Sequence, residues 1–162
     1  MISNLFKKAT TRVLGLCILA LVAGAGGSAA ARAGQEAAGD AQAAATLTVR
    51  STQFGAILFD GRGRALYAFT RDPRGGRSQC YGACAKAWPV YFARGALLAG
   101  KGVSKSLIGT VRRRDERQQV TYNGRPLYYY VGDKSPGQIL CQNVDEFGGT
   151  WLVARPNGQL VR

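Results

Sequence analysis

Short apolar runs separated by turn residues make up most of the chain. Apolar and β-branched positions alternate over 46–49, and further runs cover 55–59 and 65–69, with Asp60-Gly61 between the last two. Asp-Gly between two apolar runs is a strong hairpin signal. The pattern therefore predicts a meander of three short strands in this part of the chain.

The second half of the chain repeats this pattern of strands and turns. Strands are expected over 107–111, 118–122, 126–131, 151–153 and 159–161. Asn123-Gly124 between two of these runs predicts a tight hairpin turn. Only Tyr81 to Ala87 suggests a helical turn, and 93–106 reads as a connector. We expect a mainly β protein with little helix, folded as a small antiparallel sandwich or barrel-like domain.

The chain also contains an internal duplication. Gly63 to Asp72 reads Gly-Arg-x-Leu-Tyr-x-aromatic-x-x-Asp, and Gly124 to Asp133 repeats it at an offset of 61 residues. At the same offset Cys80 matches Cys141, and Trp88 matches Trp151 after two extra residues. A fixed offset of this kind indicates repeated supersecondary units. We therefore predict two degenerate repeats, about 46–92 and 107–162, related by a pseudo-two-fold axis.

The first 33 residues have the features of a signal peptide. Lys7, Lys8 and Arg12 precede an apolar run over 13–25, and small residues follow it. The run is shorter than the roughly 20 residues that a membrane-spanning helix needs. We expect cleavage near residue 33, export to the periplasm or beyond, and no transmembrane segment afterwards. Residues 34–45 are expected to form a disordered leader, and 46–162 a single domain.

The charge balance is strongly basic. The chain has 22 Lys and Arg against 9 Asp and Glu, and removal of 1–33 leaves 18 against 9, a net charge of +9. A basic exported protein meets anionic lipids and polymers, so anionic envelope components are candidate partners. The charge serving solubility alone stays an alternative, and no specific binding of nucleic acid is expected.

The repeated tyrosines and aspartates are the first candidate binding residues. Residues two apart in a strand share a face. The candidates are Tyr67, Phe69 and Asp72 in the first repeat, and Tyr128, Tyr130 and Asp133 in the second. They could form core aromatic pairs with the aspartates closing turns. They could instead line a shallow aromatic groove for a sugar, a cation or a metal. Core packing is the favoured interpretation.

Several motifs carry a resemblance to a known family. Both repeats read Tyr-x-[Phe/Trp/Tyr]-x-x-Asp, Cys80-x3-Cys84 precedes Trp88-Pro89, and Gly148-Gly149-Thr150 precedes Trp151. The chain resembles the bacterial secreted repeats of unknown function with a Tyr-x4-Asp motif, many of which are lipoproteins. It departs from them in lacking a lipobox cysteine. The resemblance implies an exported repeat protein and lends no activity.

Three cysteines follow the predicted signal peptide, so one disulfide would leave one thiol over. An exported compartment favours disulfides. The resemblance implies a Cys80–Cys84 bridge, whereas the repeat register leaves Cys80–Cys141 as a rival. A redox or soft-metal site is the functional alternative. No cofactor and no metal are predicted.

The chain contains no histidine. This removes the usual general base and the commonest metal ligand. We therefore expect a non-catalytic exported binding or envelope-interaction module rather than an enzyme. One alternative is a periplasmic redox or metal-handling protein that uses the cysteines. The other is a hydrolase with Asp72 and Asp133 as its carboxylate pair.

A basic cluster occupies the predicted turn between the strands at 107–111 and 118–122. Arg112, Arg113 and Arg114, with Arg117 nearby, fall at this hairpin tip. The cluster is expected to be a solvated turn or, alternatively, a contact for an anionic partner.

Overall fold

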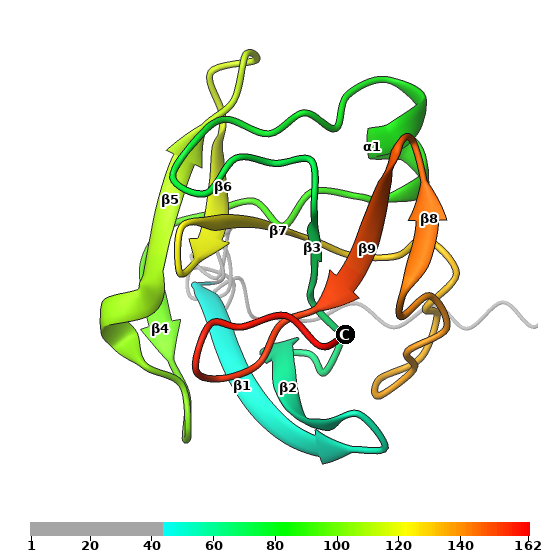
Figure 1. Ribbon diagram of the computed structural model, residues 1–162. Helices are drawn as coiled ribbons and strands as arrows, with labels where there is room; N and C mark the ends of the chain where they lie inside the picture. Colours follow the sequence, from blue (N-terminus) through cyan, green and yellow to red (C-terminus); the bar gives the residue numbers. More distant parts are fainter. Residues whose placement is uncertain (1–43) are drawn as a thin grey trace, which may run out of the picture. The chain divides into compact units, whose positions relative to one another are not determined.

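The computed structural model describes residues 44–162, which fold as short strands with one short helix (Figure 1). The elements are β1 (Ala45–Thr52), β2 (Gly55–Asp60), β3 (Tyr67–Phe69), α1 (Ala83–Ala87), β4 (Leu97–Ala99), the 3-10 helix η1 (Lys105–Leu107), β5 (Ile108–Arg112), β6 (Gln118–Tyr122), β7 (Arg125–Tyr128), β8 (Val144–Glu146) and β9 (Gly149–Val153). The fold is mainly β, as predicted. The predicted signal peptide and all but the last two residues of the predicted leader lie outside the described residues.

The larger sheet has six strands in the order β5-β6-β7-β3-β9-β8, all antiparallel. Its first three strands form the meander predicted for the second half of the chain. Asn123 and Gly124 have φ of 49° and 73° at the tight turn between β6 and β7. Positive φ at both central residues is the geometry that the Asn-Gly pair favours in a hairpin.

The meander predicted for the first half is wrong in its third strand. β1 and β2 form the expected hairpin, but β1 also takes β4 as a parallel neighbour, which gives a separate sheet β2-β1-β4. β3 leaves this sheet and lies between β7 and β9 in the larger one. The turn before β3 is held by Asp60, whose Oδ1 accepts the N–H groups of Arg62 and Arg64 at 2.9 and 2.8 Å. Beyond this turn, ladder pairing between the two runs is limited to the single bridge Phe59↔Ala65.

Three other expectations need correction. The connector at 93–106 contains β4, and β8 lies between the predicted strands 126–131 and 151–153, where no strand was expected. The last predicted strand, 159–161, is limited to one bridge between Ala154 and Leu160. The two missed strands have three residues each and lie at sheet edges. Their pairing depends on backbone geometry more than on an alternating sequence.

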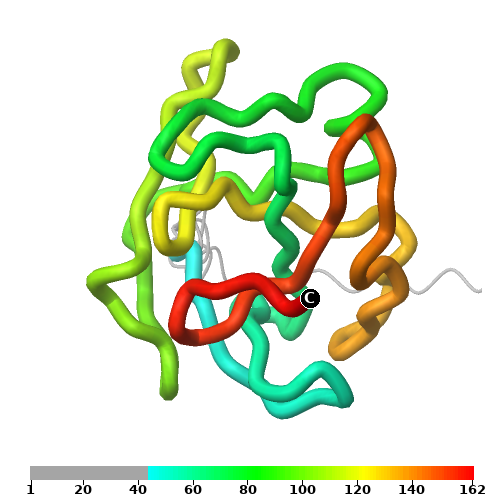
Figure 2. The backbone as a smooth tube through the Cα atoms, in the orientation of Figure 1, coloured from blue at the N-terminus to red at the C-terminus, as the bar shows by residue number. Residues whose placement is uncertain are grey.

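A pseudo-two-fold relation links the repeats at the centre of the larger sheet, where β3 pairs with β7 in antiparallel order. In Figure 2 the green segment of β3 and the yellow segment of β7 meet near the middle of the view. Tyr67 pairs directly with Tyr128, so equivalent residues of the two repeats face each other. On the outer side of β3, Tyr67 also pairs with Val153. On the outer side of β7, Tyr128 pairs with Val90 through a single bridge. Each tyrosine strand is thus flanked by the tryptophan segment of the other repeat.

Both faces of the central strands are buried. One face packs Tyr67, Phe69 and Tyr128 around the two tryptophans, and the other packs Leu66, Leu127 and their neighbours. Trp88 and Trp151 stack with ring centroids 4.0 Å apart and planes 1° from parallel. One tryptophan comes from each repeat, so this stack joins the repeats through their interior.

Candidate functional site

The motif tyrosines and aspartates bind each other across the repeats. The hydroxyl of Tyr67 donates to Oδ2 of Asp133 at 2.8 Å, and the hydroxyl of Tyr128 donates to Oδ2 of Asp72 at 2.6 Å. Both carboxylates are 3% exposed. Each repeat therefore supplies the tyrosine that satisfies the buried aspartate of the other.

The second oxygen of each carboxylate is also used. Oδ1 of Asp72 accepts the backbone N–H of Gln79 at 2.7 Å, and Oδ1 of Asp133 accepts that of Leu140 at 3.0 Å. Gln79 and Leu140 are again 61 residues apart. Each aspartate thus fixes the loop that follows its own strand while it holds the other repeat. A buried carboxylate needs such partners on both oxygens.

Two opposing effects act on the pKa of each aspartate. Burial raises the pKa of both Asp72 and Asp133, whereas the tyrosine and backbone hydrogen bonds act to lower it. Arg113 near Asp72 and Arg64 near Asp133 also favour the charged forms. Burial, with the neighbouring carboxylates, raises the pKa of Tyr67 and Tyr128 far above its usual value. The phenols therefore remain hydrogen-bond donors.

A third pair of this kind was not predicted. Tyr129 donates to Oδ2 of Asp60 at 3.0 Å, again from the second repeat to the first. Asp60 is 6% exposed, and its other oxygen holds the turn before β3. In the sequence, Asp60 was read only as part of an Asp-Gly turn. The three consecutive residues Tyr128 to Tyr130 were the available signal, because alternate residues of a strand face opposite sides.

The candidate aromatic residues are enclosed rather than arranged around an open groove. Tyr67, Phe69 and Tyr128 are buried, and Tyr130 is half-buried. Phe69 stacks on Trp151 with centroids 4.2 Å apart, and the ring of Tyr130 lies 4.9 Å from that of Trp88. The tryptophans fill the space that an aromatic ligand site would use. What these residues do in the folded chain is to bind the two repeats together.

Comparison with known proteins agrees with this two-repeat arrangement. A family described as "Secreted repeat of unknown function" matches residues 48–91 and 109–155, one match in each repeat. The chain belongs to this family. The searches of curated proteins and of solved structures found no match to this chain. Membership implies export, in line with the predicted localisation, and among residues 44–162 no helix is long and apolar enough to cross a membrane.

Among residues 44–162 of this secreted-repeat protein, two of the three cysteines form a disulfide. Cys80 and Cys84 are bonded, with their Cα atoms 5.3 Å apart, at the start of α1. Cys141, the pseudo-symmetric partner of Cys80, keeps a free and half-buried thiol. Burial raises the pKa of this thiol, which disfavours the reactive thiolate. Within the part of the chain that the structure describes, no group of three or more Cys, Asp or Glu could hold a metal ion.

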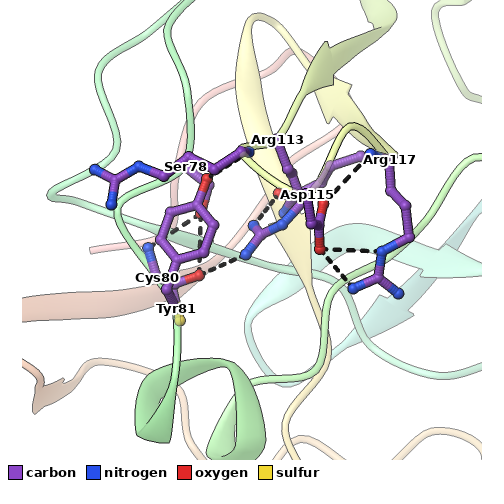
Figure 3. Close-up of polar contacts among 8 residues, drawn as sticks. Ser78, Cys80, Tyr81, Arg113, Asp115 and Arg117 are labelled. Atoms are coloured by element: carbon purple, nitrogen blue, oxygen red, sulfur yellow. Dashed lines mark hydrogen bonds and ion pairs between the residues drawn. The ribbon is translucent and has the colours of Figure 1, made fainter.

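The predicted basic cluster of this secreted-repeat protein is divided between interior and surface (Figure 3). Arg113 is only 2% exposed, in contrast to the solvated turn that was expected. It donates to Gln119 Oε1 and to the Cys80 carbonyl, both at 2.7 Å, and lies over the ring of Tyr81. Arg113 therefore secures the disulfide segment against the β5–β6 hairpin.

The other arginines of the cluster stay at the surface. Arg117 pairs with Asp115 at 2.6 Å, and Arg112 pairs with Glu116. Arg114 is exposed and lies beside the ring of Tyr81. Two of the three surface arginines at this tip are thus already paired with carboxylates.

Proposed function

We propose that this protein is a non-catalytic exported module that binds anionic components of the cell envelope through its basic surface. The observation that carries the proposal is that many of the carboxylates are buried, whereas nearly all the lysines and arginines are not. Residues 44–162 contain seven carboxylates, and Asp60, Asp72 and Asp133 are buried beneath tyrosine hydroxyls. These three carboxylates are therefore out of reach of an ion pair with an external cation.

The exposed carboxylates are also engaged. Asp115 and Glu116 pair with arginines, Asp145 accepts the hydroxyl of Thr150 at 2.6 Å, and Glu146 accepts the indole N–H of Trp88 at 2.8 Å. In the same residues there are 18 lysines and arginines, of which Arg113 is buried and two form ion pairs. The surface therefore presents an excess of cations without carboxylate partners, which attracts polyanions.

The interior supports a binding role over catalysis. Asp72 and Asp133, the candidate hydrolase pair, each spend both oxygens on hydrogen bonds within the fold. A general acid or base must be within reach of a substrate proton, and these carboxylates are enclosed. The thiol of Cys141 is free and takes no part in the Cys80–Cys84 bridge. These contacts favour a structural role for the residues that the two rival functions would need.

The experiment is binding of the exported protein to lipopolysaccharide, with a neutral glucan as the control polymer. We expect binding to lipopolysaccharide alone, and a steep loss of affinity as the ionic strength rises, because salt screens exposed charges. Equal binding to the neutral polymer, or binding that salt leaves unchanged, would refute a charge-driven function. Absence of binding at low salt would refute the proposal outright.

A further inference from the structure

A groove of about 590 Å³ lies where the loop of the first repeat meets the β5–β6 pair of the second. We call it the Gly109 groove; Leu107 and Ile108 are its apolar lining residues, and its polar and small ones are Arg74, Gly75, Ser106, Gly109, Thr121, Asn123 and Gly124. The groove is shallow and largely open to solvent, so its lining residues would meet a ligand from one side. No carboxylate lines it.

The pseudo-symmetry shows why space is open here. Leu58 N–H bonds to the Ala154 carbonyl, and Val120 N–H bonds to the Tyr91 carbonyl, both at 2.9 Å, so Leu58 and Val120 are equivalent. The residues that follow them, Phe59 and Thr121, are then equivalent too.

Their cross-strand partners are equivalent as well. Phe59 pairs with Thr48, and Thr121 pairs with Gly109. Two residues further along the strand, Arg50 of the first repeat corresponds to Val111 of the second.

The first repeat fills this place with its own side chains. The guanidinium of Arg50 lies 5.3 Å from the ring centroid of Phe59 and reaches Gly63, where an added Cβ would meet it at 2.6 Å. In the second repeat, smaller residues replace Phe59, Thr48 and Arg50 at the three equivalent positions. The groove is therefore a feature of the second repeat and not of the fold.

Thr121 marks the floor of the groove. The residue is only 6% exposed, but its hydroxyl oxygen is not enclosed and is open to the groove that it lines. A Cβ at Gly109 would stand 3.0 Å from this oxygen, so the glycine keeps the hydroxyl uncovered. The hydroxyl is therefore available to donate to, or accept from, a ligand oxygen in the groove.

Arg74 supplies the charge at the rim. Its Nε donates to the Asn123 carbonyl at 2.9 Å, and its Nη2 donates to the side chain of the same residue, which fixes the guanidinium in position. The neighbouring Gly75 N–H donates to the Gly124 carbonyl at 2.7 Å. A positioned guanidinium beside hydroxyl and amide groups suits a ligand that has both a charged oxygen group and neutral hydroxyls.

We propose that the Gly109 groove is a binding site for an anionic saccharide, a sugar that carries a phosphate or a carboxylate. The site rests on the proposed envelope-binding function and gives it a defined contact. Arg74 binds the anionic group, and Thr121 and Ser106 bind sugar hydroxyls. The absence of a lining carboxylate excludes cationic ligands.

In the test, the exported protein is titrated with a glucose phosphate monoester, glucuronate, glucose or inorganic phosphate. Binding is measured by calorimetry and by amide chemical shifts. We expect one or both anionic sugars to bind about tenfold or more tightly than glucose, because charge-assisted hydrogen bonds are the stronger ones. Shifts should centre on Gly109 and Thr121. Equal binding of inorganic phosphate would indicate an adventitious ion only and would overturn the site, as would absence of binding by both anionic sugars.

Matched variants locate the binding. Arg74→Gln should abolish most of the affinity, whereas Arg77→Gln, an equal loss of charge at an exposed position of the same loop, should not. Gly109→Val should fill the groove; if it does not fold, Thr121→Val tests the hydroxyl instead. Equal effects of Arg74→Gln and Arg77→Gln would reduce binding to bulk charge. Binding to lipopolysaccharide that survives Arg74→Gln and is not displaced by the sugars would overturn the groove and leave the proposed function standing.

Discussion

The repeated Tyr-x4-Asp motif serves contacts between repeats and not within them. Tyr67 lies in β3, and Asp72 follows the end of that strand, yet the hydroxyl of Tyr67 reaches Asp133 of the other repeat. The pairing Tyr67↔Tyr128 places equivalent residues opposite each other in antiparallel order, and each hydroxyl reaches the aspartate that follows the other strand. The spacing of the motif therefore has meaning only in the paired state.

Removal of one phenol hydroxyl tests this exchange. Tyr67→Phe leaves Asp133 buried with one oxygen unsatisfied, so we expect a loss of about 1–3 kcal/mol in the free energy of unfolding. Urea denaturation followed by circular dichroism measures it. Tyr81→Phe is the control, because the hydroxyl of Tyr81 accepts only the exposed N–H of Arg114, at 3.3 Å. A loss no larger than that of the control would mean that the hydroxyl contributes nothing to stability.

The same tyrosines predict a limit to stability at alkaline pH. Burial raises the pKa of Tyr67, Tyr91, Tyr128 and Tyr129 in the folded protein, whereas in the unfolded chain they titrate near their usual value of about 10. Since the folded state then binds more protons, stability is complete below about pH 10 and falls as the pH rises above it.

A pH titration checks this expectation: ultraviolet absorbance measures tyrosinate formation, and circular dichroism measures unfolding. These four residues should ionise together with unfolding, in one transition. Their ionisation while the circular dichroism remains native would show that the phenols are reachable by base in the folded state.

At the scale of elements, the sequence predicted what local signals encode. The hairpin at Asn123-Gly124 follows from its turn residues, and the hairpin between β1 and β2 follows from the predicted meander; both are present. The Asp60-Gly61 turn is also present, but the strand after it joins the other sheet. The partner of β3 could not be read, because Tyr67 to Phe69 is buried on both faces and its neighbours come from distant segments. β4 and β8 were missed because three residues are too few to show a period.

For the candidate sites too, the sequence predicted the features that depend on local geometry and missed those that depend on contacts between the repeats. That Tyr67 and Phe69 share a face follows from strand geometry, and both do pack in one cluster. The partners Asp133 and Trp151 depend on how the repeats meet, which no local pattern gives. The Gly109 groove has no motif at all, since it arises from residues smaller than their counterparts in the first repeat.

The disulfide acts on a single element, because it closes only the segment that leads into α1. Cys80 and Cys84 are four residues apart, and the stabilisation from a loop of that length is about 2 kcal/mol. We expect Cys80→Ala with Cys84→Ala to lower the free energy of unfolding by about this amount and to leave the protein folded. Thermal and urea unfolding measure it.

The matched control is reduction of the native protein, which breaks the bond without removing the sulfur atoms. Reduction should lower stability by a similar amount. Complete unfolding on reduction would mean that the bridge holds more than its own loop, for example the contact of the Cys80 carbonyl with Arg113.

At the scale of the whole molecule, the repeats cannot be separated without exposing buried charge. Three carboxylates of the interior depend on tyrosines from the opposite repeat, and the stacked tryptophans come one from each. The loop contacts are reciprocal as well: Gly75 N–H bonds to the Gly124 carbonyl at 2.7 Å, and Gly137 N–H bonds to the Gly63 carbonyl at 2.8 Å. Folding of either repeat alone would leave these groups without partners.

We therefore expect residues 44–102 and 103–162, produced as separate chains, to be unfolded alone and to regain the native circular dichroism when mixed. A buried charge that loses its partner costs several kcal/mol, a large share of the 5–15 kcal/mol that stabilises a typical domain. Mixing restores all three tyrosine–aspartate pairs, so recovery should fail when the second fragment carries Tyr128→Phe with Tyr129→Phe. A second fragment that folds alone, with β5 to β9 protected from hydrogen exchange, would contradict this dependence and would make the contacts between repeats secondary to the larger sheet.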